Sequence, residues 1–130
     1  MQKDFDQWNE KKKQIDAKES RLFFYQGEVW WVNLGLNIGY ETNGKGDDYM
    51  RPVIILKKYN EFSFLALPLT TSKKTNKYRI FVGVVDGKEA YGNLSQLRNI
   101  DSKRLINKVG YVDGRLFIDI KKKARRVNLD

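Results

Sequence analysis

An arginine and a group of hydroxyl side chains stand at the ends of two neighbouring apolar segments. Arg51 opens the segment RPVIIL, and one predicted hairpin later the segment LPLTTS ends on Thr70, Thr71 and Ser72. Antiparallel neighbours run in opposite directions, so the start of the first segment should lie beside the end of the second. A guanidinium can donate two parallel N–H hydrogen bonds to the oxygens of a phosphate, and hydroxyl groups add further donors. This combination indicates a site that handles phosphate groups.

A glycine-rich loop leads directly into Arg51. Residues 35–50 contain four glycines and the carboxylate of Glu41, and loops of this composition often carry functional side chains. Taken alone, Arg51 is better explained as a strand-end arginine that pairs with Asp47 or Asp48 of this loop. Only the combination of loop, arginine and hydroxyl groups favours a functional site.

The residue types that are missing exclude several kinds of chemistry. The 130 residues include no cysteine and no histidine, which excludes disulfides and any zinc or iron–sulfur site built from these side chains. A magnesium site built from carboxylates alone stays open but has no support in the sequence, so we expect no metal and no cofactor. Residues 1–14 lack the apolar core of a signal peptide, and no run of about 18 apolar residues could span a membrane. These features predict a cytoplasmic protein of one main domain, without a membrane partner.

The charge is strongly positive and unevenly distributed. Lys and Arg number 25 against 16 Asp and Glu, a formal net charge of +9. Residues 103–126 hold nine basic and two acidic residues, whereas residues 1–20 hold five of each. A basic surface that merely keeps the protein in solution is the plainer explanation. A polyanionic partner such as RNA is favoured because the same chain offers a candidate phosphate site.

The beginning of the chain has the pattern of a helix. Trp8 and Ile15 recur at helical spacing among charged residues, which predicts an amphipathic helix over residues 3–19 that packs on the main domain. We assign residues 1–21 to an N-terminal helical extension and residues 22–130 to the main domain.

Short runs of β-branched and aromatic residues between polar turns predict an antiparallel sheet. Trp30 and Trp31 alternate across the first strand, so one should lie in the core and the other at the surface or a dimer interface. The expected strands are residues 28–34, 51–58, 62–69, 78–85, 89–94 and 107–112.

The rest of the chain predicts a polar connection and a final helix. Residues 95–103 form a polar segment that should lead to a short helical turn. Leu116, Ile120, Ala124 and Val127 step by four, four and three residues, which is the apolar stripe of a C-terminal helix with a basic outer face.

Six segments of the chain resemble the MazF/PemK family of toxins and follow one another in that family's order. They are GEVWWVNLG, GYE, RPVIIL, PLTTS, LSQLRNID with SKRL, and NKVGYVD, and together they extend over residues 24–123. The resemblance implies a mainly β (α+β) fold, a small antiparallel SH3-like barrel of the CcdB/PemK plasmid-maintenance-toxin type. This chain adds an N-terminal helix and a C-terminal helix.

The resemblance also implies an activity. Members of the family are toxins of type II toxin–antitoxin systems that cut single-stranded RNA at short sequences without a metal ion. The 2′-hydroxyl attacks the phosphate and leaves a 2′,3′-cyclic phosphate and a 5′-hydroxyl. By this resemblance the catalytic residues are Arg51, Thr70 and Glu41: Arg51 and Thr70 would stabilise charge on the phosphate, and Glu41 would act as general base.

Residues that could bind the RNA chain surround these three by the same comparison. Tyr40 would stack on a base, and Gln96 and Arg98 would hydrogen-bond to base edges. The full set of predicted RNA-binding residues is Tyr40, Thr71, Ser72, Lys73, Lys74, Gln96 and Arg98. Tyr40 stands where members often have serine, and residues 42–50 form a longer connection than is usual in the family, so the cleavage sequence should differ.

The expected partners are single-stranded RNA, a cognate acidic antitoxin and a second copy of the chain in a homodimer. Two alternatives remain open from the sequence. One is a catalytically silent barrel that binds RNA through its basic surface. The other is an inhibitor of DNA gyrase of the CcdB kind, although the terminal segment RRVNLD lacks the tryptophan that such an inhibitor uses.

Overall fold

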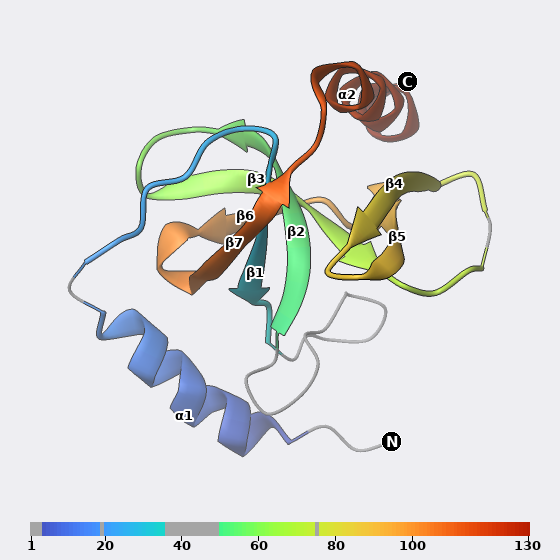
Figure 1. Cartoon of the computed structure of the whole chain (residues 1–130). Coiled ribbons are helices and arrows are strands. Elements are labelled where there is room, and N and C mark those ends of the chain that lie inside the picture. Colours follow the sequence, from blue (N-terminus) through green and yellow to red (C-terminus); the bar gives the residue numbers. More distant parts are fainter. Residues whose placement is uncertain (1–3, 19, 36–49, 75) are drawn as a thin grey trace.

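A curled sheet flanked by two helices forms the fold (Figure 1). The computed structural model describes residues 4–18, 20–35, 50–74 and 76–130, which form two α-helices, two 3₁₀ turns and seven strands. The elements in chain order are α1 (Phe5–Asp16), β1 (Glu28–Asn33), β2 (Met50–Lys58), β3 (Ser63–Thr70), β4 (Arg79–Val85), β5 (Lys88–Asn93), η1 (Leu94–Gln96), β6 (Arg98–Asp101), η2 (Ser102–Arg104), β7 (Leu105–Tyr111) and α2 (Gly114–Leu129). Neither described helix is long and apolar enough to cross a bilayer.

The strands pair in the order β4-β5-β3-β2-β1-β7, and β6 pairs with β3 beside this path. Each of these pairs is antiparallel. In Figure 1 the sheet curls into a half-barrel, with α1 near one end and α2 near the other. The predicted mainly β fold, with one helix before the strands and one after them, is confirmed.

Strand β2 runs through the middle of the sheet and contributes to two apolar clusters. Val53 and Ile55 belong to the cluster inside the curled sheet, and Ile54 belongs to the cluster on the other face. This alternation follows from the two-residue period of a strand. Helix α2 covers the second cluster with Ile120 and Ala124, so the predicted apolar stripe of the C-terminal helix is confirmed.

The polar segment at residues 95–103 was predicted without a strand, and this prediction is wrong in part. Residues Arg98–Asp101 form β6, with Ile100 paired to Phe64 and Asp101 paired to Ser63 of β3. A 3₁₀ turn flanks the strand on each side. Ile100 is the only buried side chain of this four-residue strand. So short an element offers no alternating pattern by which the sequence could reveal it.

The predicted N-terminal helix forms and packs on the barrel. The carboxylate of Asp4 accepts a hydrogen bond from the backbone N–H of Gln7 at 2.9 Å and caps the first turn. Trp8 and Ile15 are buried on the inner side of α1. The guanidinium of Arg104 lies over the Trp8 ring, 5.6 Å from its centre. Helix α1 is therefore part of the folded unit that the structure describes.

Gly35 allows this close packing. Its φ of +83° lies in the left-handed region that favours glycine. A Cβ atom at this position would collide with the ring of Trp8. Glycine is therefore required at position 35 for two reasons, which are the backbone angle there and the close docking of α1.

A buried carboxylate joins β1 to β7. Glu28 is 7% exposed, and one of its oxygens accepts hydrogen bonds from the backbone N–H of Tyr25 at 2.7 Å and from the indole N–H of Trp30 at 3.1 Å. Its other oxygen pairs with the ammonium of Lys108 at 2.7 Å. Burial alone would raise the pKa of Glu28, but the hydrogen bonds from Lys108, Trp30 and Tyr25 outweigh it and lower the pKa.

Replacing Glu28 with glutamine is expected to lower the free energy of unfolding at neutral pH by about 2 kcal/mol, because Lys108 and the two N–H donors lose a charged partner. A carboxylate whose pKa is lower in the folded state than in the unfolded state stabilises the fold at any pH above its unfolded-state pKa. That stabilisation is lost as the pH falls through the folded-state pKa. The difference between wild type and variant should therefore shrink below about pH 4. Urea unfolding of both proteins across this range would measure it, and a difference that stays constant with pH would contradict the prediction.

Candidate active site at the ends of β2 and β3

The beginning of β2 lies beside the end of β3, as the sequence predicted. The pairing of β2 with β3 reaches Val53 opposite Pro68, and Arg51 and Thr70 each lie two residues beyond this pair. The guanidinium of Arg51 donates a hydrogen bond to the backbone oxygen of Leu69 at 3.0 Å. Both Arg51 and Thr70 are half-buried. The fold therefore brings the first two predicted catalytic residues to adjacent strand ends.

The hydroxyl groups after β3 belong to a tight local turn. The hydroxyl oxygen of Thr70 accepts a hydrogen bond from the backbone N–H of Ser72 at 3.2 Å. The Ser72 hydroxyl oxygen accepts one from the backbone N–H of Lys74 at 3.5 Å. Thr71 is exposed between them. In both contacts the hydroxyl oxygen is the acceptor, so each hydroxyl hydrogen remains available for donation to a ligand.

Arg79 is a further cationic residue of this site, and no motif in the sequence indicated it. It is the first residue of β4, and its guanidinium donates a hydrogen bond to the backbone oxygen of Ser72 at 2.9 Å. Its Nε is buried and has no hydrogen-bond partner among the described residues. Helix α2 supports the same position, because the ammonium of Lys123 donates to the backbone oxygen of Arg79 at 3.0 Å. No described carboxylate forms an ion pair with Arg79.

Arg51 and Arg79 influence each other electrostatically. Burial lowers the pKa of Arg51, and the positive charge of Arg79 lowers it further. An arginine keeps its charge at neutral pH even so. Two guanidinium groups held near each other can donate hydrogen bonds to the oxygens of one phosphate group, so the pair is well suited to such a ligand. We name Arg51, Thr70, Ser72 and Arg79 the arginine–hydroxyl cluster.

Two predicted site residues cannot be placed relative to this cluster. Glu41, the predicted general base, and Tyr40, the predicted stacking residue, lie outside the described residues. Asp47 and Asp48, the acids considered as structural partners of Arg51, also lie outside them. The roles of Glu41 and Tyr40 therefore stay predictions.

The other predicted RNA-binding residues spread away from the cluster. Lys73 and Lys74 follow Ser72 directly and are exposed, and Lys73 lies 3.9 Å from Glu89. Gln96 belongs to η1, and Arg98 pairs with Ala66 of β3. Ala66 precedes Thr70 by four residues, which is about 13 Å along a strand. The backbone of Arg98 is therefore displaced along β3 from the end that carries Thr70, which suits contact with a neighbouring nucleotide better than with a phosphate held by the cluster.

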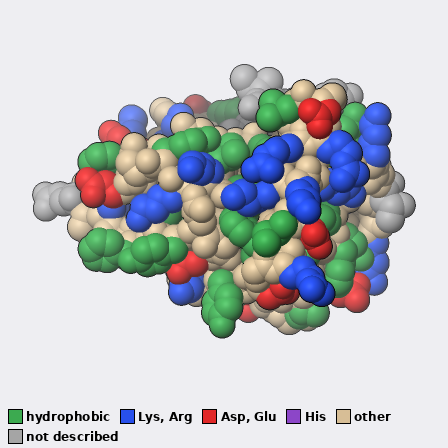
Figure 2. All heavy atoms as spheres, turned by 90° about the horizontal axis from the view of Figure 1, so that it is seen from above, with side chains coloured by type: hydrophobic (Ala, Val, Ile, Leu, Met, Phe, Trp, Pro, Cys, Tyr) green, Lys and Arg blue, Asp and Glu red, His purple; other side chains and the backbone are tan. Residues whose placement is uncertain are grey.

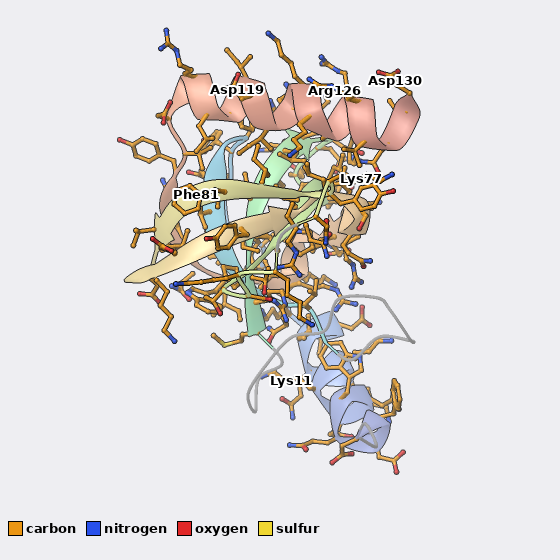
Figure 3. The ribbon with its side chains drawn as sticks, turned by 90° about the vertical axis from the view of Figure 1, so that its right-hand side faces the viewer. Lys11, Lys77, Phe81, Asp119, Arg126 and Asp130 are labelled. Atoms are coloured by element: carbon orange, nitrogen blue, oxygen red, sulfur yellow. The ribbon has the colours of Figure 1, made fainter. Side chains whose placement is uncertain are left out.

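The basic excess near the carboxyl end lies on another part of the surface. Figure 2 looks down on α2 and shows Lys and Arg side chains gathered there. The exposed basic residues of the helix are Arg115, Lys122, Arg125 and Arg126. Figure 3 shows Arg126 on the outer side of α2, at the end of the molecule opposite α1.

Among the described residues, no group of three or more acidic side chains could hold a metal ion.

Comparison with known proteins identifies the family. Residues 25–127 match the model of the PemK-like, MazF-like toxins of type II toxin–antitoxin systems. Comparison with curated protein sequences gives no match.

Several solved structures share the fold. MazF from Deinococcus radiodurans superposes with a TM-score of 0.66 at 19% sequence identity, covering 78% of this chain and 93% of that one. An endoribonuclease in complex with its cognate antitoxin, from a mycobacterial species, gives 0.61 at 18% identity and covers 83% and 98%. The Mycobacterium tuberculosis toxin MazF-mt6 gives 0.59 at 14% identity and covers 79% and 98%. At these identities the structures establish the shared fold, and the match over residues 25–127 shows that this chain belongs to the PemK-like, MazF-like toxin family of type II toxin–antitoxin systems.

Proposed function

We propose that this protein is a toxin that acts as an endoribonuclease on single-stranded RNA at specific short sequences. The observation that carries the proposal is the arginine–hydroxyl cluster: Arg51 and Arg79 are held by backbone oxygens at the end of β3, next to the hydroxyl groups of Thr70 and Ser72. The fold of solved endoribonuclease toxins supports the same activity.

In the proposed reaction, the 2′-oxygen of a ribose attacks the adjacent phosphorus, and the bond from phosphorus to the 5′-oxygen breaks. The proton of the 2′-hydroxyl passes to Glu41, and the departing 5′-oxygen takes up a proton from water. The products are a 2′,3′-cyclic phosphate and a 5′-hydroxyl. Negative charge builds on the non-bridging phosphate oxygens in the transition state, where Arg51, Arg79 and the hydroxyl of Thr70 donate hydrogen bonds.

Guanidinium groups supply in this site the positive charge that metal ions supply in many other nucleases. Arg51 acts mainly as an electrostatic clamp, because a group that stays charged at neutral pH is a poor proton donor. We therefore propose a reaction that needs neither a metal ion nor a cofactor.

The partners follow from the same proposal. An acidic antitoxin suits the formal net charge of +9, and one of the similar solved structures contains a cognate antitoxin. We also propose a homodimer in which each copy carries one arginine–hydroxyl cluster. The division at residues 21 and 22 into a helical extension and a toxin domain is part of the proposal, as is action in the cytoplasm, where messenger RNA is found.

Incubation of the purified protein with a long single-stranded RNA in the presence of EDTA tests the activity. We expect cleavage at recurrent short sequences, and far slower cleavage by an Arg51→Ala variant purified in parallel. Arg115→Ala, which removes an exposed arginine of α2, is the matched control and should cleave as wild type does. RNA that stays intact across varied sequences but remains bound would contradict the proposal and favour a silent RNA-binding barrel.

A further inference from the structure

A cavity of about 580 Å³ lies between α1 and the barrel, outside the arginine–hydroxyl cluster. Cavities of this size hold small ligands or single nucleotides. Its described lining includes four basic side chains and no carboxylate. These basic residues are Lys11, Lys18, Arg21 and Lys103. We name this space the α1 cavity.

Backbone contacts hold two of the ammonium groups in place. Lys18 donates a hydrogen bond to the backbone oxygen of Lys103 at 2.8 Å, and Lys103 donates one to the backbone oxygen of Asp16 at 3.0 Å. An ammonium has three donors, so each retains two for a ligand. Arg21 forms an ion pair with Asp101 at 2.5 Å, whereas neither Lys18 nor Lys103 pairs with a described carboxylate. The α1 cavity therefore has a net positive charge fixed by the fold.

The shift in the pKa of Lys18 is the one expected for a partly buried ammonium group beside another positive charge in the α1 cavity. Burial lowers the pKa of Lys18, and the charge of Lys11 lowers it further. The negative charge of a bound anion would offset both effects. The chemistry that this site would recognise is a phosphate group.

The position of the cavity relates it to the arginine–hydroxyl cluster. Asn33 lines the cavity and pairs across β1 and β2 with Met50, the residue before Arg51. Figure 1 shows α1 beside the end of the barrel where β1 ends and β2 begins. Figure 3 shows Lys11 at the end of the molecule opposite Arg126, so this site is separate from the basic surface of α2. Helix α1 also lies outside residues 25–127, which match the family.

We propose that the α1 cavity binds the sugar–phosphate backbone of the single-stranded RNA, outside the nucleotides at the cleaved bond. This inference rests on the proposed function, because it takes RNA as the substrate. Lys18 and Lys103 contact backbone phosphates there, with Lys11 adding positive charge. The N-terminal helix thereby lengthens the stretch of RNA that the toxin holds, and it raises affinity without contributing to the chemical step.

Binding of a single-stranded oligonucleotide that carries 2′-O-methyl groups throughout tests this proposal, since attack by a 2′-hydroxyl cannot cut it. Gln14→Glu places a carboxylate at the exposed edge of the cavity and removes no described hydrogen bond. Gln7→Glu makes the same change on the same helix, at an exposed position that does not line the cavity. We expect Gln14→Glu to weaken binding roughly fivefold, the size of one unit-charge contact in water. Gln7→Glu should change it less than twofold.

A second variant tests the phosphate contact itself. Lys18→Gln should reduce the slope of log affinity against log salt by about 0.7, the value for one phosphate contact with a single strand. Hydrogen exchange of the backbone amides of α1 would show whether α1 stays docked in this variant; if it does not, Gln14→Glu decides alone. Equal binding by Gln14→Glu and Gln7→Glu, or an unchanged slope in a docked Lys18→Gln protein, would overturn the proposal.

Two further outcomes are distinguishable. Adenosine 5′-monophosphate is titrated beside the oligonucleotide. If Gln14→Glu weakens binding of the mononucleotide but not of the oligonucleotide, the cavity serves a free nucleotide and the RNA-backbone proposal is wrong. Because the oligonucleotide cannot be cut, a protein that cleaves no RNA but shows the expected binding differences would contradict the proposed activity and leave this inference standing.

Discussion

Replacing Arg51 with alanine is expected to lower the rate of RNA cleavage by roughly 10³-fold, the upper range for loss of one preorganised donor to a charged transition state. The reason is the position of Arg51, half-buried at the start of β2 and held by the backbone oxygen of Leu69. Charge interactions in such a partly dehydrated place are stronger than in water. Single-turnover cleavage of an RNA with one cleavage site would measure the effect.

Lysine at the same position provides a graded control. Arg51→Lys keeps the charge but loses the forked pair of donors, so it should recover only part of the lost rate. Because Arg51 also donates a hydrogen bond to the backbone oxygen of Leu69, thermal unfolding of both variants is measured in parallel to separate a loss of catalysis from a loss of the fold. If both variants fold and cleave at the wild-type rate, Arg51 is not a catalytic residue.

Replacing Arg79 with alanine is expected to lower the cleavage rate by roughly 10²-fold. The guanidinium of Arg79 donates to the backbone oxygen of Ser72 and is close enough to Arg51 to lower its pKa. Loss of this second charge removes stabilisation of the phosphate in the transition state. The same single-turnover assay would measure it, together with RNA affinity determined on an uncleavable oligonucleotide.

Glutamine separates the charge of Arg79 from its structural contact. Arg79→Gln keeps an N–H donor for the backbone oxygen of Ser72 but carries no charge. If the charge matters, Arg79→Gln should be nearly as slow as Arg79→Ala. A glutamine variant that cleaves as fast as wild type would mean that Arg79 only supports the turn after β3.

The sequence predicted those parts of the fold that depend on local pattern. Strand β2 and helix α2 have clear apolar periods, and the structure buries the residues that those periods select, such as Ile54 and Ile120. Strand β6 was not predicted, because Ile100 is its single buried side chain and one residue makes no alternating pattern. It is held by pairing with β3, a contact between distant parts of the chain that no local pattern records.

The same distinction between local pattern and distant pairing applies to the residues of the candidate site. Arg51 and Thr70 could be brought together from the sequence, because one hairpin connects their strands. Arg79 could not, because it reaches the site through two further pairings, β4 with β5 and β5 with β3. In the sequence it is an ordinary arginine after a polar loop. Its position becomes informative only when the sheet curls and its neighbours are known.

One measurement tests the central claim most directly: cleavage in EDTA of an RNA that carries a single 2′-deoxynucleotide on the 5′ side of the mapped cleavage position, with the normal RNA alongside. The proposed reaction uses that 2′-hydroxyl as its nucleophile. We therefore expect the normal RNA to yield a 2′,3′-cyclic phosphate and a 5′-hydroxyl, and the substituted RNA to stay intact at that position. Cleavage of the substituted RNA, or ends with a 5′-phosphate, would contradict the account.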